Sequence, residues 1–200
     1  AVHHLVAPLG RRLVFHRRSA VSEEPVHRAA EDLRVVIEGG LAVASKGEVI
    51  IENPPLEHLI EFINKIKETG NVAEVLKDNT LRFAYKGKIK PVSVETAPHP
   101  GFKTDWQPNW AVLMTQAKSI SYIHERVFEN RFSYVSELQK LGAHVTFETV
   151  KVDDPEEFYE FYYEKNKGYQ QKIKILFTIN PRTNKKIDLF EFNKKIKSME

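Results

Sequence analysis

The chain has 200 residues, of which 42% are hydrophobic and 28% charged, a composition typical of a globular chain with one sizeable core. Its net charge of +3 at pH 7 requires neither a nucleic acid nor a membrane as partner, and no apolar run approaches the ~18 residues that span a bilayer. Because the chain contains no cysteine, disulfides, thiolate metal sites and thiol nucleophiles are excluded within it. We expect a cytoplasmic protein.

The two ends of the chain differ in composition from its middle. Residues 1–34 contain six arginines and no lysine, whereas the remainder contains 20 lysines and four arginines. Either a separate basic arm or a different coding origin, such as a shifted reading frame, explains this difference. The last residues change again, to clustered Phe and Tyr followed by lysines. We therefore divide the chain into an Arg-rich segment (1–33), a central α/β domain (34–152) and a Lys- and aromatic-rich segment (153–200).

The first elements of the central domain are a strand and a helix. Residues 48–52 predict a strand, and Asn53 after it can cap a helix whose first turn begins with Pro54 and Pro55. The predicted helix ends at Gly70, a residue that readily adopts positive φ. Its apolar stripe is Leu56, Leu59, Ile60, Ile63 and Ile66.

Strands and helices alternate through the rest of the central domain. Strands are predicted at 72–76, 80–85 and 90–96, followed by a largely apolar helix capped by Thr104 or Asp105. A strand at 119–128, a short helix at 133–141 ending at Gly142, and a strand at 143–152 complete the pattern.

A weak internal repeat runs through these elements. The sequence VIIEN, followed by a helix that ends at Gly70, is similar to RVFEN, followed by a helix that ends at Gly142. Asn53 and Asn130 are 77 positions apart, a separation that suits duplication of a strand–helix–strand unit. The pattern predicts an α/β fold with helices on one face of each sheet and more than one such unit.

Asp105 has two interpretations. As a helix N-cap or first-turn residue it would stabilise the fold by roughly 0.5–2 kcal/mol. As a catalytic base it would have to reach a substrate hydroxyl and accept its proton. The helix dipole favours the ionised carboxylate, which suits a hydroxyl that loses its proton while attacking a strong electrophile.

Arg126 and Arg131 flank Val127 and Phe128 near a predicted strand end, where α/β proteins commonly hold ligands. One interpretation is a pair of solvated arginines around a buried Phe128. The other is a binding site in which a guanidinium contacts phosphate and the phenyl ring forms an apolar wall for a base or sugar.

Other chemistries have little support. His3, His4 and His16 lack the carboxylate or cysteine spacing of a metal site, so no metal is expected. The chain has no Gly-rich phosphate loop, nucleophile elbow or zinc-protease motif. The aromatic and basic tail permits stacking on single-stranded nucleic acid, but an amphipathic or partly buried segment is the preferred interpretation.

Two motifs dominate the middle of the chain: H-P-G-F-x-T-D-x-Q at 99–107 and E-x-x-F-E-N-R-F at 125–132, followed by ELQKLGA. With these motifs in this order, residues 34–152 resemble the UDP-N-acetylglucosamine 1-carboxyvinyltransferases of the enolpyruvyl-transferase family. The resemblance implies an inside-out α/β barrel built from repeated strand–helix units. It also implies transfer of enolpyruvate from phosphoenolpyruvate to the 3′-hydroxyl of UDP-N-acetylglucosamine, the first committed step of peptidoglycan synthesis.

The resemblance also implies roles for four residues. Asp105 matches the aspartate that contacts the sugar hydroxyl and is held to take its proton. Val127, with Phe128 beside it, matches the wall that holds the nucleotide sugar, and Arg131 matches an arginine near the site. No metal or other cofactor and no membrane or nucleic acid partner is implied, and nothing in the sequence indicates an oligomeric state.

The chain also departs from the family pattern. The mobile loop with its acid residue, and the lysine and arginines that bind phosphoenolpyruvate, lie outside the matched portion, while Lys103 and Pro108 replace more common residues. We therefore expect an incomplete piece of such an enzyme that is inactive by itself. Two rival hypotheses are a non-catalytic nucleic-acid-binding module and an enolpyruvyl transferase that acts on shikimate 3-phosphate.

Overall fold

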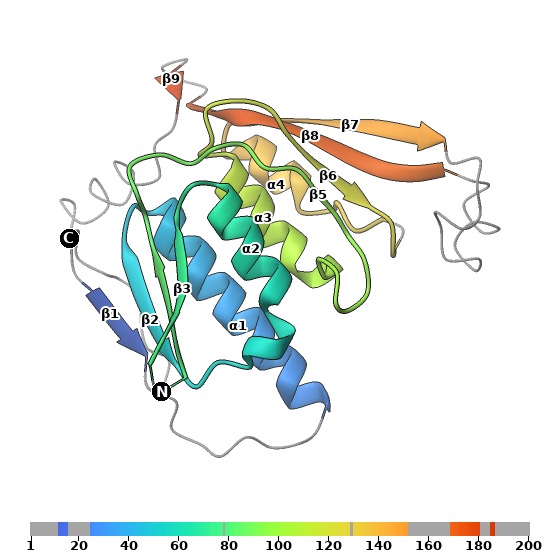
Figure 1. Cartoon of the computed structure of the whole chain (residues 1–200). Helices are drawn as coiled ribbons and strands as arrows, with labels where there is room; N and C mark the ends of the chain where they lie inside the picture. Colours follow the sequence, from blue (N-terminus) through green and yellow to red (C-terminus); the bar gives the residue numbers. More distant parts are fainter. Residues whose placement is uncertain are drawn as a thin grey trace.

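Two mixed β-sheets lie on either side of a layer of helices, as Figure 1 shows. The computed structural model describes residues 12–15, 25–77, 79–128, 130–151, 169–180 and 185–186. Sheet A has the order β1 (Arg12–Phe15), β2 (Glu48–Glu52), β4 (Thr80–Ala84), β3 (Val72–Leu76). Sheet B has the order β5 (Val94–Glu95), β6 (Ser121–Glu125), β8 (Tyr169–Asn180), β7 (Ala143–Lys151), and β9 (Lys185–Lys186) pairs with β8.

The helices α1, α2 and α3 lie between these sheets, and α4 packs against β7 (Figure 1). Their bounds are α1 (Pro25–Ala44), α2 (Ile60–Glu68), α3 (Gln107–Met114) and α4 (Val135–Lys140), with 3₁₀ turns η1 (Leu56–His58) and η2 (Thr104–Trp106) before α2 and α3. Because the helices are inside and the sheets outside, the arrangement agrees with the inside-out α/β fold expected from the sequence. No helix in the described ranges is both long enough and apolar enough to cross a bilayer.

The same unit occurs twice in the chain. In each unit the first strand pairs in parallel with the second, the second pairs antiparallel with the fourth, and the third lies outside the fourth. Helices α1 and α3 connect the parallel strands, and α2 and α4 follow the second strand. Gly70 and Gly142 both follow the second helix of their unit and have φ of 84° and 89°. The internal repeat is therefore present in the fold.

Asn53 and Asn130, the two asparagines used to detect the repeat, do not occupy equivalent positions in the two units. The sequence alignment that paired them is therefore wrong at this point. Asn53 directly follows β2, whereas Asn130 comes five positions after the end of β6. Nor does Asn53 cap a helix: it has φ of 50°, and Pro55 occupies the N-cap position of η1 without a side-chain hydrogen bond. The second unit thus has an irregular segment directly after its second strand.

The apolar stripe predicted for α2 is wrong at Ile60. Ile60 is exposed, whereas Phe62, which lies off the predicted stripe, is buried. Phe62 makes edge-to-face contacts with Phe83 of β4 and with Trp106 and Trp110. Because η1 and α2 are separate elements, α2 is shorter than the predicted helix. Its buried face contains Phe62, Ile63 and Ile66 and differs from the predicted stripe.

Both ends of the chain contribute strands to the sheets. β1, from the Arg-rich segment, pairs with β2, and β8 pairs with both β6 and β7. Helix α1 runs across residue 34, where the composition changes. His3, His4 and His16, and the aromatic cluster at 158–163, lie outside the described residues.

Candidate functional site

The two sequence motifs meet at one edge of sheet B. Strands β5 and β6 are parallel, with Val94 opposite Ile123 and Glu95 opposite His124. The carboxyl ends of parallel strands lie at the same edge of a sheet, so the segments that follow them are neighbours. The segment after β5 leads to η2 and Asp105, and the segment after β6 contains Val127, Phe128 and Arg131.

The loop between β5 and η2 is a tight turn. Ala97 N donates to Phe102 O at 2.9 Å, and Gly101 N donates to Pro98 O at 2.7 Å. A Cβ at Gly101 would lie 2.5 Å from the Cβ of Ala97, so a larger residue could not occupy this position without a shift of the loop. The glycine of the H-P-G-F sequence is thus explained by close packing within the turn.

Asp105 projects outward between two anchored neighbours. Thr104 is buried and its hydroxyl donates to Glu125 Oε2 at 2.7 Å, while Trp106 is buried against Phe62 and Phe102. The Asp105 side chain is 64% exposed. Neither Thr104 nor Asp105 is a helix N-cap, because the N-cap positions of η2 and α3 are Lys103 and Trp106, and neither has a side-chain cap hydrogen bond. Asp105 is therefore not an N-cap, but it does lie in the first turn of η2, as the structural interpretation also allowed.

Arg131 connects Asp105 to the wall residues. Its Nη2 donates a hydrogen bond to Asp105 Oδ1, and its guanidinium lies 5.5 Å from the centre of the Phe128 ring. Phe128 is exposed, which excludes the interpretation of two arginines around a buried phenyl ring. The structure thus brings Asp105, Arg131 and Phe128 together, with Val127 next to Phe128 in the chain.

Arg126 points elsewhere. Its Nη1 bonds to Glu95 Oε2 at 3.2 Å, on β5. Arg126 and Arg131 therefore do not act as one cationic pair, although they flank the same dipeptide.

Glu125 is the residue that the sequence analysis missed. It is 2% exposed at the end of β6 and accepts hydrogen bonds from both the η2 region and the segment after β6. The available signal was the alternation of the strand, in which Ser121, Ile123 and Glu125 share the inward face. A glutamate at an inward position, beginning a motif, indicates a buried carboxylate with dedicated partners.

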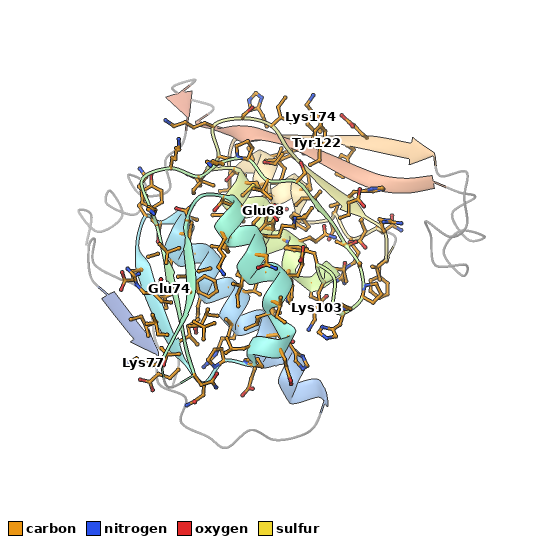
Figure 2. All side chains as sticks on the ribbon, in the orientation of Figure 1. Glu68, Glu74, Lys77, Lys103, Tyr122 and Lys174 are labelled. Atoms are coloured by element: carbon orange, nitrogen blue, oxygen red, sulfur yellow. The ribbon has the colours of Figure 1, made fainter. Side chains whose placement is uncertain are left out.

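Lys103, one of the departures from the family pattern, has a partner on α1. Its Nζ lies 2.6 Å from Oδ2 of the buried Asp32, and His58 Nδ1 lies 3.3 Å from the same oxygen. Figure 2 shows Lys103 beside the helices, away from Tyr122 and Lys174 on sheet B. The pair links α1 to the loop that leads to Asp105.

Burial and neighbouring charges change the pKa of one hydroxyl near the site, that of Tyr134. Burial raises the pKa of Tyr134, the negative charge of Glu125 adds to this, and Arg131 opposes it. The hydroxyl therefore stays protonated at neutral pH and donates to Gln107 Oε1 at 2.9 Å. Among the described residues, no three His, Cys, Asp or Glu side chains are grouped as metal ligands.

A model of the EPSP synthase (3-phosphoshikimate 1-carboxyvinyltransferase) family matches residues 39–160. Similar curated proteins include UDP-N-acetylglucosamine 1-carboxyvinyltransferase of Protochlamydia amoebophila, 41% identical over 109 residues, and UDP-N-acetylglucosamine 1-carboxyvinyltransferase 2 of Carboxydothermus hydrogenoformans, 44% identical over 110 residues. Each alignment covers 54% of this chain, but 23% and 26% of the respective relative. The aligned part of the chain thus spans about a quarter of the length of these relatives, and the family resemblance of the two motifs is confirmed.

Among solved structures, the enolpyruvyl transferase NikO from Streptomyces tendae matches with a TM-score of 0.51 and 19% sequence identity. The match covers 73% of this chain and 31% of that one. It supports the fold alone, and it confirms that the α/β fold is that of the enolpyruvyl transferases.

Proposed function

The chain belongs to the EPSP synthase (3-phosphoshikimate 1-carboxyvinyltransferase) family, and from this premise we propose that its central part forms the sugar-side half of an enolpyruvyl-transferase site. The proposed acceptor is UDP-N-acetylglucosamine, which the names of the similar curated proteins support. The product would be an early precursor of peptidoglycan. The observation that carries the proposal is the contact of Asp105 with Arg131, and of Arg131 with Phe128, at the edge of sheet B.

The reaction needs a base for the sugar hydroxyl, an acid for the methylene carbon of phosphoenolpyruvate, and cations for its phosphate and carboxylate. Asp105 is the proposed base. Its exposed carboxylate can receive the hydroxyl proton while the oxygen attacks the carbon that bears the phosphate and the acid adds a proton to the methylene carbon. Loss of phosphate and of one proton from the resulting methyl group then restores the carbon–carbon double bond.

Arg131 and the apolar wall position the reactants in this proposal. The guanidinium holds the Asp105 carboxylate in one orientation, and a planar cation over the Phe128 ring orients that ring as well. Val127 and Phe128 then present an apolar surface to the nucleotide sugar, close to the carboxylate.

The first test is a titration of the 200-residue chain with UDP-N-acetylglucosamine and, separately, with shikimate 3-phosphate. Amide resonances are followed by ¹H–¹⁵N NMR. We expect tighter binding of the nucleotide sugar, with the largest shifts at Val127, Phe128 and Arg131. Tighter binding of shikimate 3-phosphate would make it the proposed acceptor instead. If neither ligand binds, the proposed site is wrong.

The second test addresses the role of Asp105 in an active enzyme that contains this chain. Asp105→Asn should lower kcat about 10²- to 10⁴-fold, because general base catalysis contributes that much, while the Kd for UDP-N-acetylglucosamine changes little. Glu137→Gln is a matched control, since Glu137 is 66% exposed and also lies in a surface ion pair, but on α4. Wild-type kcat in the Asp105 variant would refute the proposed role.

A further inference from the structure

Glu125 is a buried carboxylate beside the proposed site. It is the last residue of β6 and is 2% exposed, at the third inward position of the strand after Ser121 and Ile123. Burying a carboxylate costs free energy unless hydrogen bonds replace the water that it loses. Its hydrogen-bond partners therefore show which parts of the chain it organises.

One oxygen of Glu125 binds the segment of the apolar wall. Oε1 accepts hydrogen bonds from the backbone N–H groups of Val127 at 2.8 Å and Phe128 at 2.9 Å. It also accepts one from the hydroxyl of Thr96 at 2.8 Å. The backbone directly after β6 is thus folded back over the carboxylate, which sets the position of both wall residues.

The other oxygen binds the turn that carries Asp105. Oε2 accepts hydrogen bonds from the hydroxyl of Thr104 at 2.7 Å and from Nε2 of Gln107. Thr104 and Gln107 lie on either side of Asp105 in the sequence. One carboxyl group therefore joins the two segments that hold the proposed base and the proposed wall.

A second layer of hydrogen bonds fixes the orientation of these partners. The Tyr134 hydroxyl donates to Gln107 Oε1 at 2.9 Å, so the amide of Gln107 must direct its Nε2 toward Glu125. The backbone N–H of Arg126 donates to Thr96 Oγ1 at 2.8 Å. The groups that form hydrogen bonds with the carboxylate are thus all donors.

We propose that Glu125 is the positioning residue of the site: its carboxylate sets the distance and orientation between the Asp105 turn and the Val127–Phe128 backbone. The expected effect of Glu125 on UDP-N-acetylglucosamine binding rests on the proposed function. Its effect on the placement of the two segments does not. Asp105 itself meets the second segment through the exposed Arg131 side chain. The buried link through Glu125 is therefore the one that can hold the two segments in register.

The test compares Glu125→Gln with the wild type in the 200-residue chain. The glutamine oxygen can still face the backbone N–H groups, but its NH₂ group then faces the Gln107 amide, which must flip for the variant to fold. Neutral hydrogen bonds are weaker than charge-assisted ones. We expect amide exchange at Val127 and Phe128 to become about tenfold faster, and UDP-N-acetylglucosamine to bind about tenfold more weakly.

Ile123→Val is the matched control. Ile123 is buried on the same face of β6, and its truncation weakens the core without touching the carboxylate. We expect this variant to be less stable than the wild type, with unchanged exchange at Val127 and Phe128 and unchanged nucleotide-sugar affinity. If Glu125 were only a structural residue of the core, the two variants would behave alike at matched stability.

The outcomes separate this inference from the proposed function. If the wild type does not bind UDP-N-acetylglucosamine, the proposed function fails, and amide exchange alone decides the role of Glu125. If the wild type binds and Glu125→Gln keeps both its exchange rates and its affinity, the inference is overturned. Should Glu125→Gln not fold, Thr104→Val decides: weaker binding by a folded variant supports the inference, and wild-type affinity overturns it.

Discussion

Side chains that are adjacent in the sequence have different roles in this chain because the backbone directs them to different surroundings. Thr104 and Trp106 are buried, and Asp105 between them is exposed. The two buried neighbours provide the packing and hydrogen bonds that hold the turn. The carboxylate is therefore available to solvent, or to a substrate, without any loss from the core.

Glu38 is another buried carboxylate, but among the described residues it is not surrounded by donors as Glu125 is. It is 6% exposed on α1, and its Oε2 has no hydrogen-bond partner within the part of the chain that the structure describes. Burial raises its pKa above the ordinary value of 4.5, and Arg34, one turn earlier, opposes this only in part. Because the pKa of Glu38 is higher in the folded state than in the unfolded state, its contribution to stability is fully present below the unfolded-state pKa. This contribution is lost as the pH rises through the folded-state pKa.

Glu38→Gln should therefore stabilise the chain at pH 7.5, since an uncharged amide is less costly to bury than a carboxylate. A gain of about 1 kcal/mol would raise Tm by roughly 2–4 °C in a chain of this size. Thermal unfolding at pH 7.5 and at pH 4.5 measures the effect, and the gain should shrink at the lower pH. An equal gain at both values would show that ionisation of Glu38 is not the cause.

Two adjacent glycines determine how closely α1 packs on sheet A. A Cβ at Gly39 would lie 2.7 Å from two atoms of the Phe83 ring, whereas a Cβ at Gly40 would meet no atom within 4 Å. Phe83 is buried and in edge-to-face contact with Phe62, so its ring cannot move freely. Of the two glycines, only Gly39 therefore lies where α1 approaches sheet A closely.

Gly39→Ala should destabilise the chain by about 1–3 kcal/mol through overpacking against Phe83. Gly40→Ala should instead stabilise it, by up to about 1 kcal/mol, because alanine restricts the unfolded backbone and favours the helix. Urea unfolding of both variants gives the two free energies. Changes of the same sign would contradict the packing argument.

The two units of the chain differ at the place where the site lies. After β2 the chain turns at once at Asn53, whereas after β6 it first forms the irregular segment that contains Val127 and Phe128. Glu125, at the end of β6, holds this segment through two backbone hydrogen bonds. The repeated unit thus provides the framework, and the segment after β6 distinguishes the unit that contains the candidate site.

At the level of the whole molecule, the described residues around Asp105 supply a carboxylate, an apolar wall and a guanidinium that is already paired. Enolpyruvyl transfer also requires an acid and further cations for phosphoenolpyruvate. The chain spans about a quarter of the length of its similar relatives. We therefore expect this chain to contribute binding of the nucleotide sugar, and the reaction to need additional groups.

We expect the 200-residue chain by itself to release no phosphate from phosphoenolpyruvate in the presence of UDP-N-acetylglucosamine. General acid and electrostatic contributions each supply about 10² or more in rate, so a chain that does not provide these groups would show no measurable turnover. A phosphate assay with Asp105→Asn as the background control measures this. Release that depends on Asp105 would mean that this chain supplies the remaining groups itself.

The sequence alone was sufficient for the class of fold and for most of the strands and helices, and its motifs supplied the four residues named as site candidates, whose roles remain proposals. Strand and helix periodicity, turn glycines and contiguous motifs depend on residues that are close in the chain, so they can be read directly. Asp105, Phe128 and Arg131 were found by their motifs, and the structure places them in contact.

Only the tertiary structure decided which side chains are buried and which partners they bind. The exposure of Ile60, the burial of Phe62 and the link from Glu125 to Thr104 all depend on contacts between separate elements. Such contacts exist only once the parallel pairing of β5 with β6 has brought segments more than 20 positions apart to one edge of a sheet. A local pattern contains no information about that pairing, and for this reason the buried carboxylate between the two motifs was not recognised from the sequence.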